Sequence, residues 1–116
     1  MNKFKELLVW QKAMDLVEQI YIITADFPKE EKFGLQSQIR RCGVSIPSNI
    51  AEGAGRNSKN EFRHFLSYAL GSSYELETQL SLALRFNYFT KEQLETISNV
   101  LDQVQKMIVG LSKTLN

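Results

Sequence analysis

In this chain of 116 residues, one glutamate and one histidine have the types and spacing of metal ligands. Glu61 and His64 stand three positions apart, the spacing that places two metal ligands on one helix face in di-iron carboxylate bundles. Such a site takes two of these pairs and two further carboxylates, whereas His64 is the only histidine. We therefore predict no metal site, and Glu61 is better explained as part of a helix cap.

A nucleophile and a phosphate-binding loop are the other chemistries that the residue types suggest. Cys42 lies between Ile39 and Ile46 at helical spacing, so the single thiol falls on an apolar stripe, where cysteines are usually inert. Gly53 and Gly55 fit neither nucleotide-binding fingerprint and have no strand before them. No set of residues supplies a base, a nucleophile and a stabilising donor together. We predict a protein that has no catalytic residues and no cofactor.

Composition limits the class of protein. Hydrophobic residues make up 43% and charged residues 23%, and 14 Lys and Arg oppose 13 Asp and Glu, which is typical of one globular domain over residues 1–116. The single cysteine excludes an intramolecular disulfide. The N-terminus lacks the apolar run of a signal peptide, and no stretch approaches the roughly 18 apolar residues of a membrane span. We expect a cytoplasmic protein with no membrane partner.

Four runs of apolar residues at steps of three and four predict four helices. The first begins near Trp10 and ends at Phe27–Pro28, because proline cannot continue the hydrogen-bond pattern. The second begins near Leu35 and passes through Pro47 as one kinked helix. Connections of about three to five residues imply antiparallel neighbours. We therefore predict an all-α, up-down-up-down four-helix bundle whose second helix is kinked at Pro47.

Local signals mark the remaining helix ends. Gly53–Gly55 suits the end of the second helix, since glycine readily adopts the left-handed conformation found there. The segments 58–61 and 90–93 are predicted capping boxes that begin the third and fourth helices. The third helix is small at its middle, where Ala69, Gly71, Ser72 and Ser73 are expected to let another backbone approach closely.

The first predicted helix carries two apolar stripes. One stripe contains Trp10, Ala13, Met14, Val17, Ile20, Tyr21 and Thr24, and the second contains Val9, Leu16, Ile20, Ile23 and Phe27. We place Trp10 in the bundle core together with Ile39, Ile46, Leu76 and Leu80. Because one bundle core cannot easily bury both stripes, we expect the second stripe to be covered by other subunits of a homo-oligomer.

A polar stripe follows the second predicted helix at steps of three and four. Its members are Gln38, Arg41, Ser45, Asn49, Glu52 and Arg56. Serine and asparagine are poor helix formers with short side chains, so a face built from them gains little from solvent exposure. The stripe is either a free surface or a polar network with the third helix or with another subunit. The candidates for the network are Ser45, Asn49, Glu52, Glu75 and Gln79.

Basic residues gather on the second predicted helix and in the turn after it. As candidates for binding nucleic acid we take Arg40, Arg41, Arg56, Lys59 and Arg63. Residues 1–60 hold nine Lys and Arg against seven Asp and Glu, and residues 61–116 hold five against six, so the excess is slight. An oligomer can align several copies of a small basic patch into one surface that binds nucleic acid. The alternative is that these residues form a plain surface patch with no ligand.

Several segments form a pattern that is more specific than helical periodicity. They are Leu8–Met14, Phe27–Pro28, Gln38–Arg41, Ser45–Gly53, Arg56, Gly71–Ser72 and Glu75–Leu80. In order and over nearly the whole chain, they resemble the bacterial four-helix bundle family named for proteins encoded in 23S ribosomal RNA intervening sequences. The resemblance implies an antiparallel bundle that assembles into a homopentameric ring.

A relative of that family, the accessory protein of diversity-generating retroelements, binds a reverse transcriptase and nucleic acid through a basic oligomeric surface. That accessory protein is strongly basic, and this chain departs from it because its own net charge is only +1. We expect a non-enzymatic, homo-oligomeric scaffold that associates with RNA, DNA or a ribonucleoprotein. The alternative is an adaptor that binds a protein partner through apolar surface on the first and fourth helices and uses its arginines for ion pairs between subunits.

Overall fold

The fold is known from a computed structural model that describes residues 3–116. Met1 and Asn2 lie outside the described residues. They begin the N-terminal segment whose sequence argues against a signal peptide. The described chain forms two short 3₁₀ helices and four α-helices, and residues 3–116 contain no strand. The elements are η1 (Phe4–Glu6), α1 (Leu8–Thr24), η2 (Lys29–Glu31), α2 (Leu35–Ala54), α3 (Lys59–Arg85) and α4 (Lys91–Lys113).

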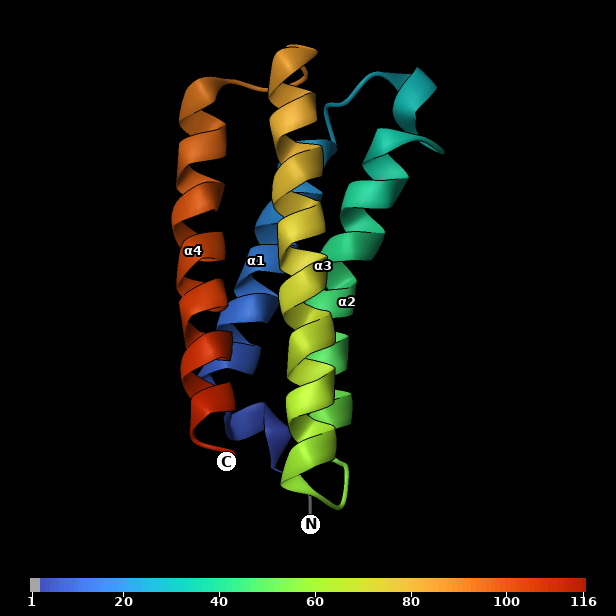
Figure 1. The fold of residues 1–116 in the computed structure, drawn as a ribbon. Coiled ribbons are helices and arrows are strands. Elements are labelled where there is room, and N and C mark those ends of the chain that lie inside the picture. The colour runs from blue at the N-terminus through green and yellow to red at the C-terminus, as the bar shows by residue number, and fades with distance from the viewer. Residues whose placement is uncertain (1–2) are drawn as a thin grey trace.

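The four long helices lie side by side in a bundle (Figure 1). The connections from α1 to α2 and from α3 to α4 lie at one end, and the turn from α2 to α3 lies at the other end together with the C-terminus (Figure 1). Successive helices therefore run in opposite directions in this view. The predicted all-α four-helix bundle is confirmed. α2 continues through Pro47 as one helix, and the kink there stays a prediction.

Side-chain caps begin the last two helices. At α4, Thr90 Oγ1 accepts a hydrogen bond from the Gln93 amide at 3.1 Å, and Gln93 Oε1 accepts one from the Thr90 amide at 2.8 Å, so this capping box is confirmed. At α3 only half of the predicted box forms. Ser58 Oγ accepts from the Glu61 amide at 3.1 Å, but the Glu61 carboxylate accepts from the Ser58 hydroxyl instead of its amide.

Two other helix ends differ from what the sequence suggests. Gly55 lies in the right-handed region, at φ −85° and ψ −2°, so the expected left-handed glycine is wrong. Its amide donates to the carbonyls of Ala51 and Glu52, which satisfies the end of α2 without a left-handed residue. At the start of α2 the sequence reasoning missed a cap. The Glu31 carboxylate in η2 accepts from the Leu35 amide at 3.0 Å and from the Tyr88 hydroxyl at 2.6 Å.

The core contains the second apolar stripe of α1 but not Trp10. The second stripe, with Leu16 and Ile20 at its centre, is buried inside the monomer. The prediction that other subunits cover this stripe is therefore wrong. Trp10 is only half-buried and meets Phe4 edge-on, so its predicted place in the core is also wrong. The reason is that α1 packs against both α2 and α4, which together cover the second stripe. The other predicted core residues are fully buried, namely Ile39, Ile46, Leu76 and Leu80.

α2 approaches α3 closely at Gly53. A Cβ atom at Gly53 would lie 2.6 Å from Phe65 Cβ and 3.3 Å from the Phe62 carbonyl oxygen. A Cβ atom at Gly71 would meet nothing within 4 Å among the described residues, so Gly71 serves no close approach there and the prediction at this position is wrong. Gly53, at the last turn of α2, is thus the glycine that tight packing requires.

Replacing these two glycines by alanine should have opposite effects on stability. We expect Gly53→Ala to lower the free energy of unfolding by about 1–3 kcal/mol, because the added methyl group collides with Phe65. Gly71→Ala should raise it by about 0.5–1 kcal/mol, because alanine favours the helix and the site is open. Urea denaturation of both variants measures the difference. Equal effects from the two changes would contradict the close packing at Gly53.

Candidate nucleic-acid interface

The polar stripe of α2 meets α3 in a shallow groove of about 340 Å³. The central contact is a hydrogen bond of 2.6 Å between the hydroxyls of Ser45 and Ser72. The sequence singles out Ser72 as a small residue and as part of the family pattern, and its nearness to Ser45 depends on how the helices pack. The groove is lined by Gln38, Arg41, Cys42, Ser45, Ser72, Glu75 and Gln79.

The structure thus brings together part of the predicted polar network. Ser45, Glu75 and Gln79 line the groove, and Gln79 Nε2 lies 3.5 Å from a Glu75 carboxylate oxygen. Asn49 does not join them, because its amide donates to the Ser45 carbonyl within α2 at 2.8 Å. Glu52 instead pairs with Arg56 at 2.8 Å, one turn further along. The network therefore joins α2 to α3 over its middle turns only.

Cys42 lies at the back of this groove as a neutral thiol. Its Sγ donates to the Ser72 carbonyl at 3.6 Å. Burial, reinforced by the charge of the nearby Glu75 carboxylate, raises the pKa of the Cys42 thiol to about 12. Because the thiolate is the reactive form, this environment suits an inert core thiol and not a nucleophile.

Arg40 and Arg41 are neighbours in sequence but serve different surfaces. The Arg40 guanidinium donates to Thr24 Oγ1 at 2.8 Å and to the Tyr21 carbonyl at 3.2 Å, and it lies 4.4 Å from the centre of the Tyr21 ring. These contacts fasten α2 to the last turn of α1, where a cation is also favoured by the helix dipole. Arg41 is exposed and lines the groove between α2 and α3.

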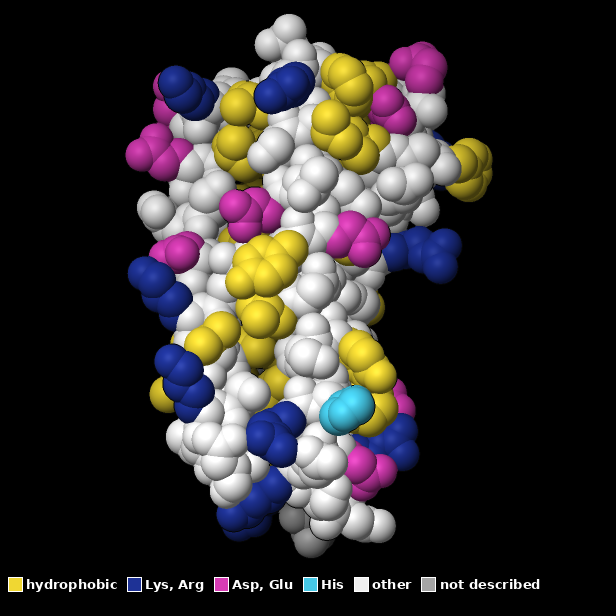
Figure 2. Space-filling model, in the orientation of Figure 1, with side chains coloured by type: hydrophobic (Ala, Val, Ile, Leu, Met, Phe, Trp, Pro, Cys, Tyr) yellow, Lys and Arg dark blue, Asp and Glu magenta, His cyan; other side chains and the backbone are white. Residues whose placement is uncertain are grey.

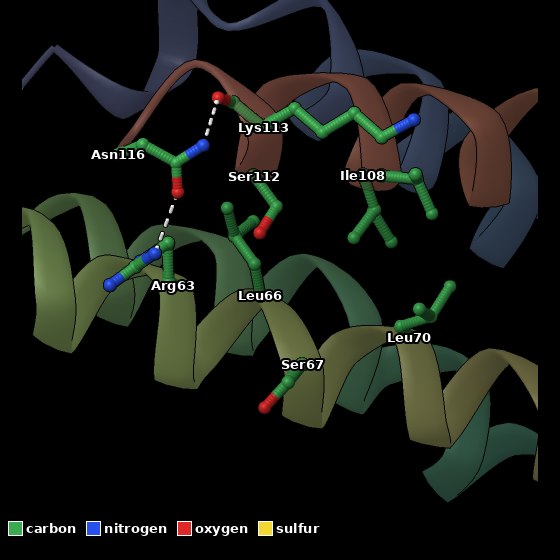
Figure 3. Close-up of a pocket in the computed structure, with 9 residues that line it drawn as sticks. Arg63, Leu66, Ser67, Leu70, Ile108, Ser112, Lys113 and Asn116 are labelled. Atoms are coloured by element: carbon green, nitrogen blue, oxygen red, sulfur yellow. Dashed lines mark hydrogen bonds between the residues drawn. The ribbon is translucent and has the colours of Figure 1, made fainter.

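Arg63 joins α3 to Asn116, three positions beyond the end of α4 (Figure 3). Its guanidinium donates to Asn116 Oδ1 at 2.8 Å and to Asn60 Oδ1 at 2.7 Å. Beside this contact a groove of about 320 Å³ runs between the two helices, over an apolar floor that includes Leu66 and Ile108. Arg63 therefore lies at the surface but has part of its hydrogen-bonding capacity committed within the chain.

Arg56 lies in the turn between α2 and α3, and Lys59 is the first residue of α3, so both are at the same end of the bundle as Arg63 (Figure 1). Lys59 is exposed. One guanidinium nitrogen of Arg56 pairs with Glu52, and the centre of the guanidinium lies 4.7 Å from the centre of the Phe65 ring. The five predicted basic candidates are therefore divided. Arg56, Lys59 and Arg63 are brought together, and Arg40 and Arg41 lie away from them along α2.

Charge is distributed unevenly between the two ends of the described bundle. We call the end that holds the α2–α3 turn the basic end, because six cationic side chains there oppose three carboxylates. The cations are Lys3, Lys5, Arg56, Lys59, Arg63 and Lys113, and the carboxylates are Glu6, Glu52 and Glu61. Figure 2 shows several Lys and Arg side chains at this end, near the histidine.

The opposite end has the reverse balance. It carries four cations, Lys29, Lys32, Arg85 and Lys91, against five carboxylates, Asp26, Glu30, Glu31, Glu92 and Glu95. Although the net charge of the protein is only +1, the basic end of the described bundle has an excess of cations, which favours anions there. Two of the contributing segments, η1 and the end of α4, were not among the sequence candidates, because they are distant in sequence from the α2–α3 turn.

The residues first considered for catalysis lie at this basic end. Glu61 and His64 are both exposed on α3. Among residues 3–116, no three His, Cys, Asp or Glu side chains lie close enough together to hold a metal ion. In the same described range, no helix is long and apolar enough to cross a membrane.

Fold and site together describe an all-α four-helix bundle with a basic end and a polar groove between α2 and α3. The chain belongs to the 23S rRNA-intervening sequence protein family, whose model matches residues 5–110. It is also similar to the crystal structure of a protein of unknown function from the S23 ribosomal protein family of Bacteroides thetaiotaomicron VPI-5482. That structure is 30% identical, with a TM-score of 0.84, and the match covers 91% of this chain and 96% of that one. No curated protein matches the chain.

The contacts of the two neighbouring arginines predict different effects on stability. Arg40→Ala should lower the free energy of unfolding by about 1–2 kcal/mol, because it removes charged hydrogen bonds to the buried Thr24 hydroxyl and to Tyr21. Arg41→Ala should change it by less than about 0.5 kcal/mol, since Arg41 is exposed. Thermal and urea denaturation measure both. Similar values for the two variants would show that the Arg40 contacts add no stability.

The buried thiol predicts low reactivity in the folded protein. At about pH 8 a thiol reagent should modify native Cys42 far more slowly than a free cysteine, since thiolate is scarce and access is poor. Addition of denaturant should restore the rate of an ordinary cysteine. Absorbance of the released chromophore follows the reaction, and fast modification of native protein would contradict the neutral thiol.

Proposed function

We propose that this protein is a non-enzymatic, homo-oligomeric helical scaffold that associates with RNA or a ribonucleoprotein in the cytoplasm. The observation that carries the proposal is the separation of charge along the bundle, with six cations against three carboxylates at the basic end. Phosphate groups bind to clustered Lys and Arg side chains and release counterions, so a basic end on a neutral protein favours a polyanionic partner.

Exposed apolar side chains on α1 support the oligomeric part of the proposal. Leu8 and Ile22 are 70% and 74% exposed and lie on the outer side of a helix whose core stripe is already buried within the monomer. Large aliphatic side chains in such positions are often covered by another subunit. In a ring with rotational symmetry, each subunit presents its basic end in the same way, so the small patches of several copies combine. The family resemblance suggests five subunits.

A protein-binding adaptor is the second candidate function. It is favoured by a groove of about 290 Å³ between α1 and α4, at the end opposite the basic end. Ile22 and Ile23 supply apolar surface there, and Asp26 and Gln93 supply polar groups around it. A groove of this kind suits the apolar face of a partner helix. Under this alternative the arginines form ion pairs between subunits and the basic end binds no nucleic acid.

Two matched double variants test the RNA-binding surface. R56Q/K59Q removes two cations from the basic end, and R85Q/K91Q removes two from the opposite end. We expect the first to lower RNA affinity and to reduce the salt slope of binding by about 1–2, whereas the second should change neither. Fluorescence anisotropy at several salt concentrations measures both quantities. Equal losses from the two variants, or no binding by the wild type, would overturn the proposal.

Native mass spectrometry of the protein from a cell lysate tests the assembly. A ring that carries RNA mass supports the scaffold, and a ring that carries a protein partner and no RNA supports the adaptor. A monomer at micromolar concentration would contradict the oligomer, and would leave Leu8 and Ile22 as ordinary exposed residues.

A further inference from the structure

An open pocket lined by aromatic and polar side chains lies beside the basic end, where the α2–α3 turn meets α3. It has a volume of about 320 Å³ and is lined by Arg56, Asn60, Glu61, His64, Phe65 and Tyr68. The five residues from α3 stand at steps that place them on one helix face. The pocket opens to solvent, since Tyr68 is 54% exposed and His64 is also exposed.

The rings in this pocket leave stacking surface free. Tyr68 meets Phe65 at 5.6 Å between ring centres and His64 at 6.4 Å, with angles between the ring planes of 86° and 83°. Neither neighbour therefore lies flat on Tyr68. Phe65 differs, because the Arg56 guanidinium lies over its ring. Among residues 3–116, neither aromatic neighbour lies flat on the exposed Tyr68 ring, and Arg56 lines the same pocket, so an unstacked base can lie on Tyr68.

Polar groups around the rings complement the parts of a nucleotide. One guanidinium nitrogen of Arg56 pairs with Glu52 and the others remain donors, and the exposed Lys59 follows three positions later, so two cations are available to phosphates beside the pocket. The Glu61 carboxylate accepts hydrogen bonds, as from the amino group of a base. Asn60 uses its side-chain oxygen on Arg63, which leaves the amide nitrogen as a donor.

We propose that this pocket binds an unpaired nucleotide of a single-stranded RNA segment. The base stacks on Tyr68 and the adjacent phosphate lies near Arg56 and Lys59. Unpaired bases are favoured over a duplex because the faces of paired bases are already stacked and cannot reach an aromatic side chain. This inference rests on the proposed function, and it deepens that function by naming the class of RNA and the residue that holds the base.

The chain provides a matched control for the central residue. Tyr74 is 53% exposed on the same helix, but it lies on the side of α3 that faces α4 and beyond this pocket. Tyr68→Ala and Tyr74→Ala therefore remove the same side chain from equally exposed positions of α3. Tyr68→Phe keeps the ring and removes only the hydroxyl. Circular dichroism and thermal denaturation establish that the three variants fold.

Fluorescence anisotropy with a labelled, mixed-sequence single strand of about 12 nucleotides tests the proposal, with the same sequence in duplex form as comparison. We expect Tyr68→Ala to weaken single-strand binding by roughly tenfold with an unchanged salt slope, because stacking releases no counterions. Tyr74→Ala and Tyr68→Phe should stay within about twofold of the wild type. The duplex should bind more weakly than the single strand and should be insensitive to Tyr68→Ala.

Two kinds of failure are distinguishable. If the wild type binds the single strand but Tyr68→Ala and Tyr74→Ala behave alike, the stacking site is overturned and the RNA-associated scaffold stands. If the wild type binds neither single strand nor duplex, both proposals are overturned. Loss of binding to a protein partner on Tyr68→Ala, with RNA affinity unchanged, would also overturn the stacking site and assign the pocket to protein recognition.

Discussion

The close packing of α2 against α3 is the contact on which the other features depend. Gly53 lets the last turn of α2 lie directly on Phe62 and Phe65, with no room for a methyl group. Further along, the Ser45 and Ser72 hydroxyls meet at 2.6 Å, so small residues hold the two helices together over much of their length. This pair makes the most extensive contact between helices in the described chain.

That close packing also places the functional groups at the basic end. A short turn follows α2, and because α2 already lies on Phe65, Arg56 falls over the Phe65 ring. Tyr68, one turn further along α3, remains open to solvent beside it. The same end collects η1 and the end of α4, whose lysines add to the cations of the turn. One helix contact thus leads both to the basic end and to the aromatic pocket.

Hydrogen bonds within the chain decide which basic residues remain free to bind. Arg40 is engaged by Thr24 and Tyr21, and Arg63 by Asn60 and Asn116. From the sequence alone these arginines are equivalent to Arg56, since all are basic residues on or beside the second and third predicted helices. Thr24 lies 16 positions from Arg40 in the sequence, and Asn116 lies 53 positions from Arg63. No local pattern identifies contacts at that distance, so only part of the candidate site could be predicted.

Local sequence determined what depends on neighbouring residues. Apolar periodicity predicted the four helices, and Thr90 with Gln93 predicted a cap that forms as expected, since both interactions lie within a few residues. Only the tertiary structure decided which stripe of α1 is buried and which charges meet at one end. Burial of Leu16 rather than Trp10 depends on packing by α2 and α4 together. The basic end likewise combines distant segments, because charges add in space and not along the chain.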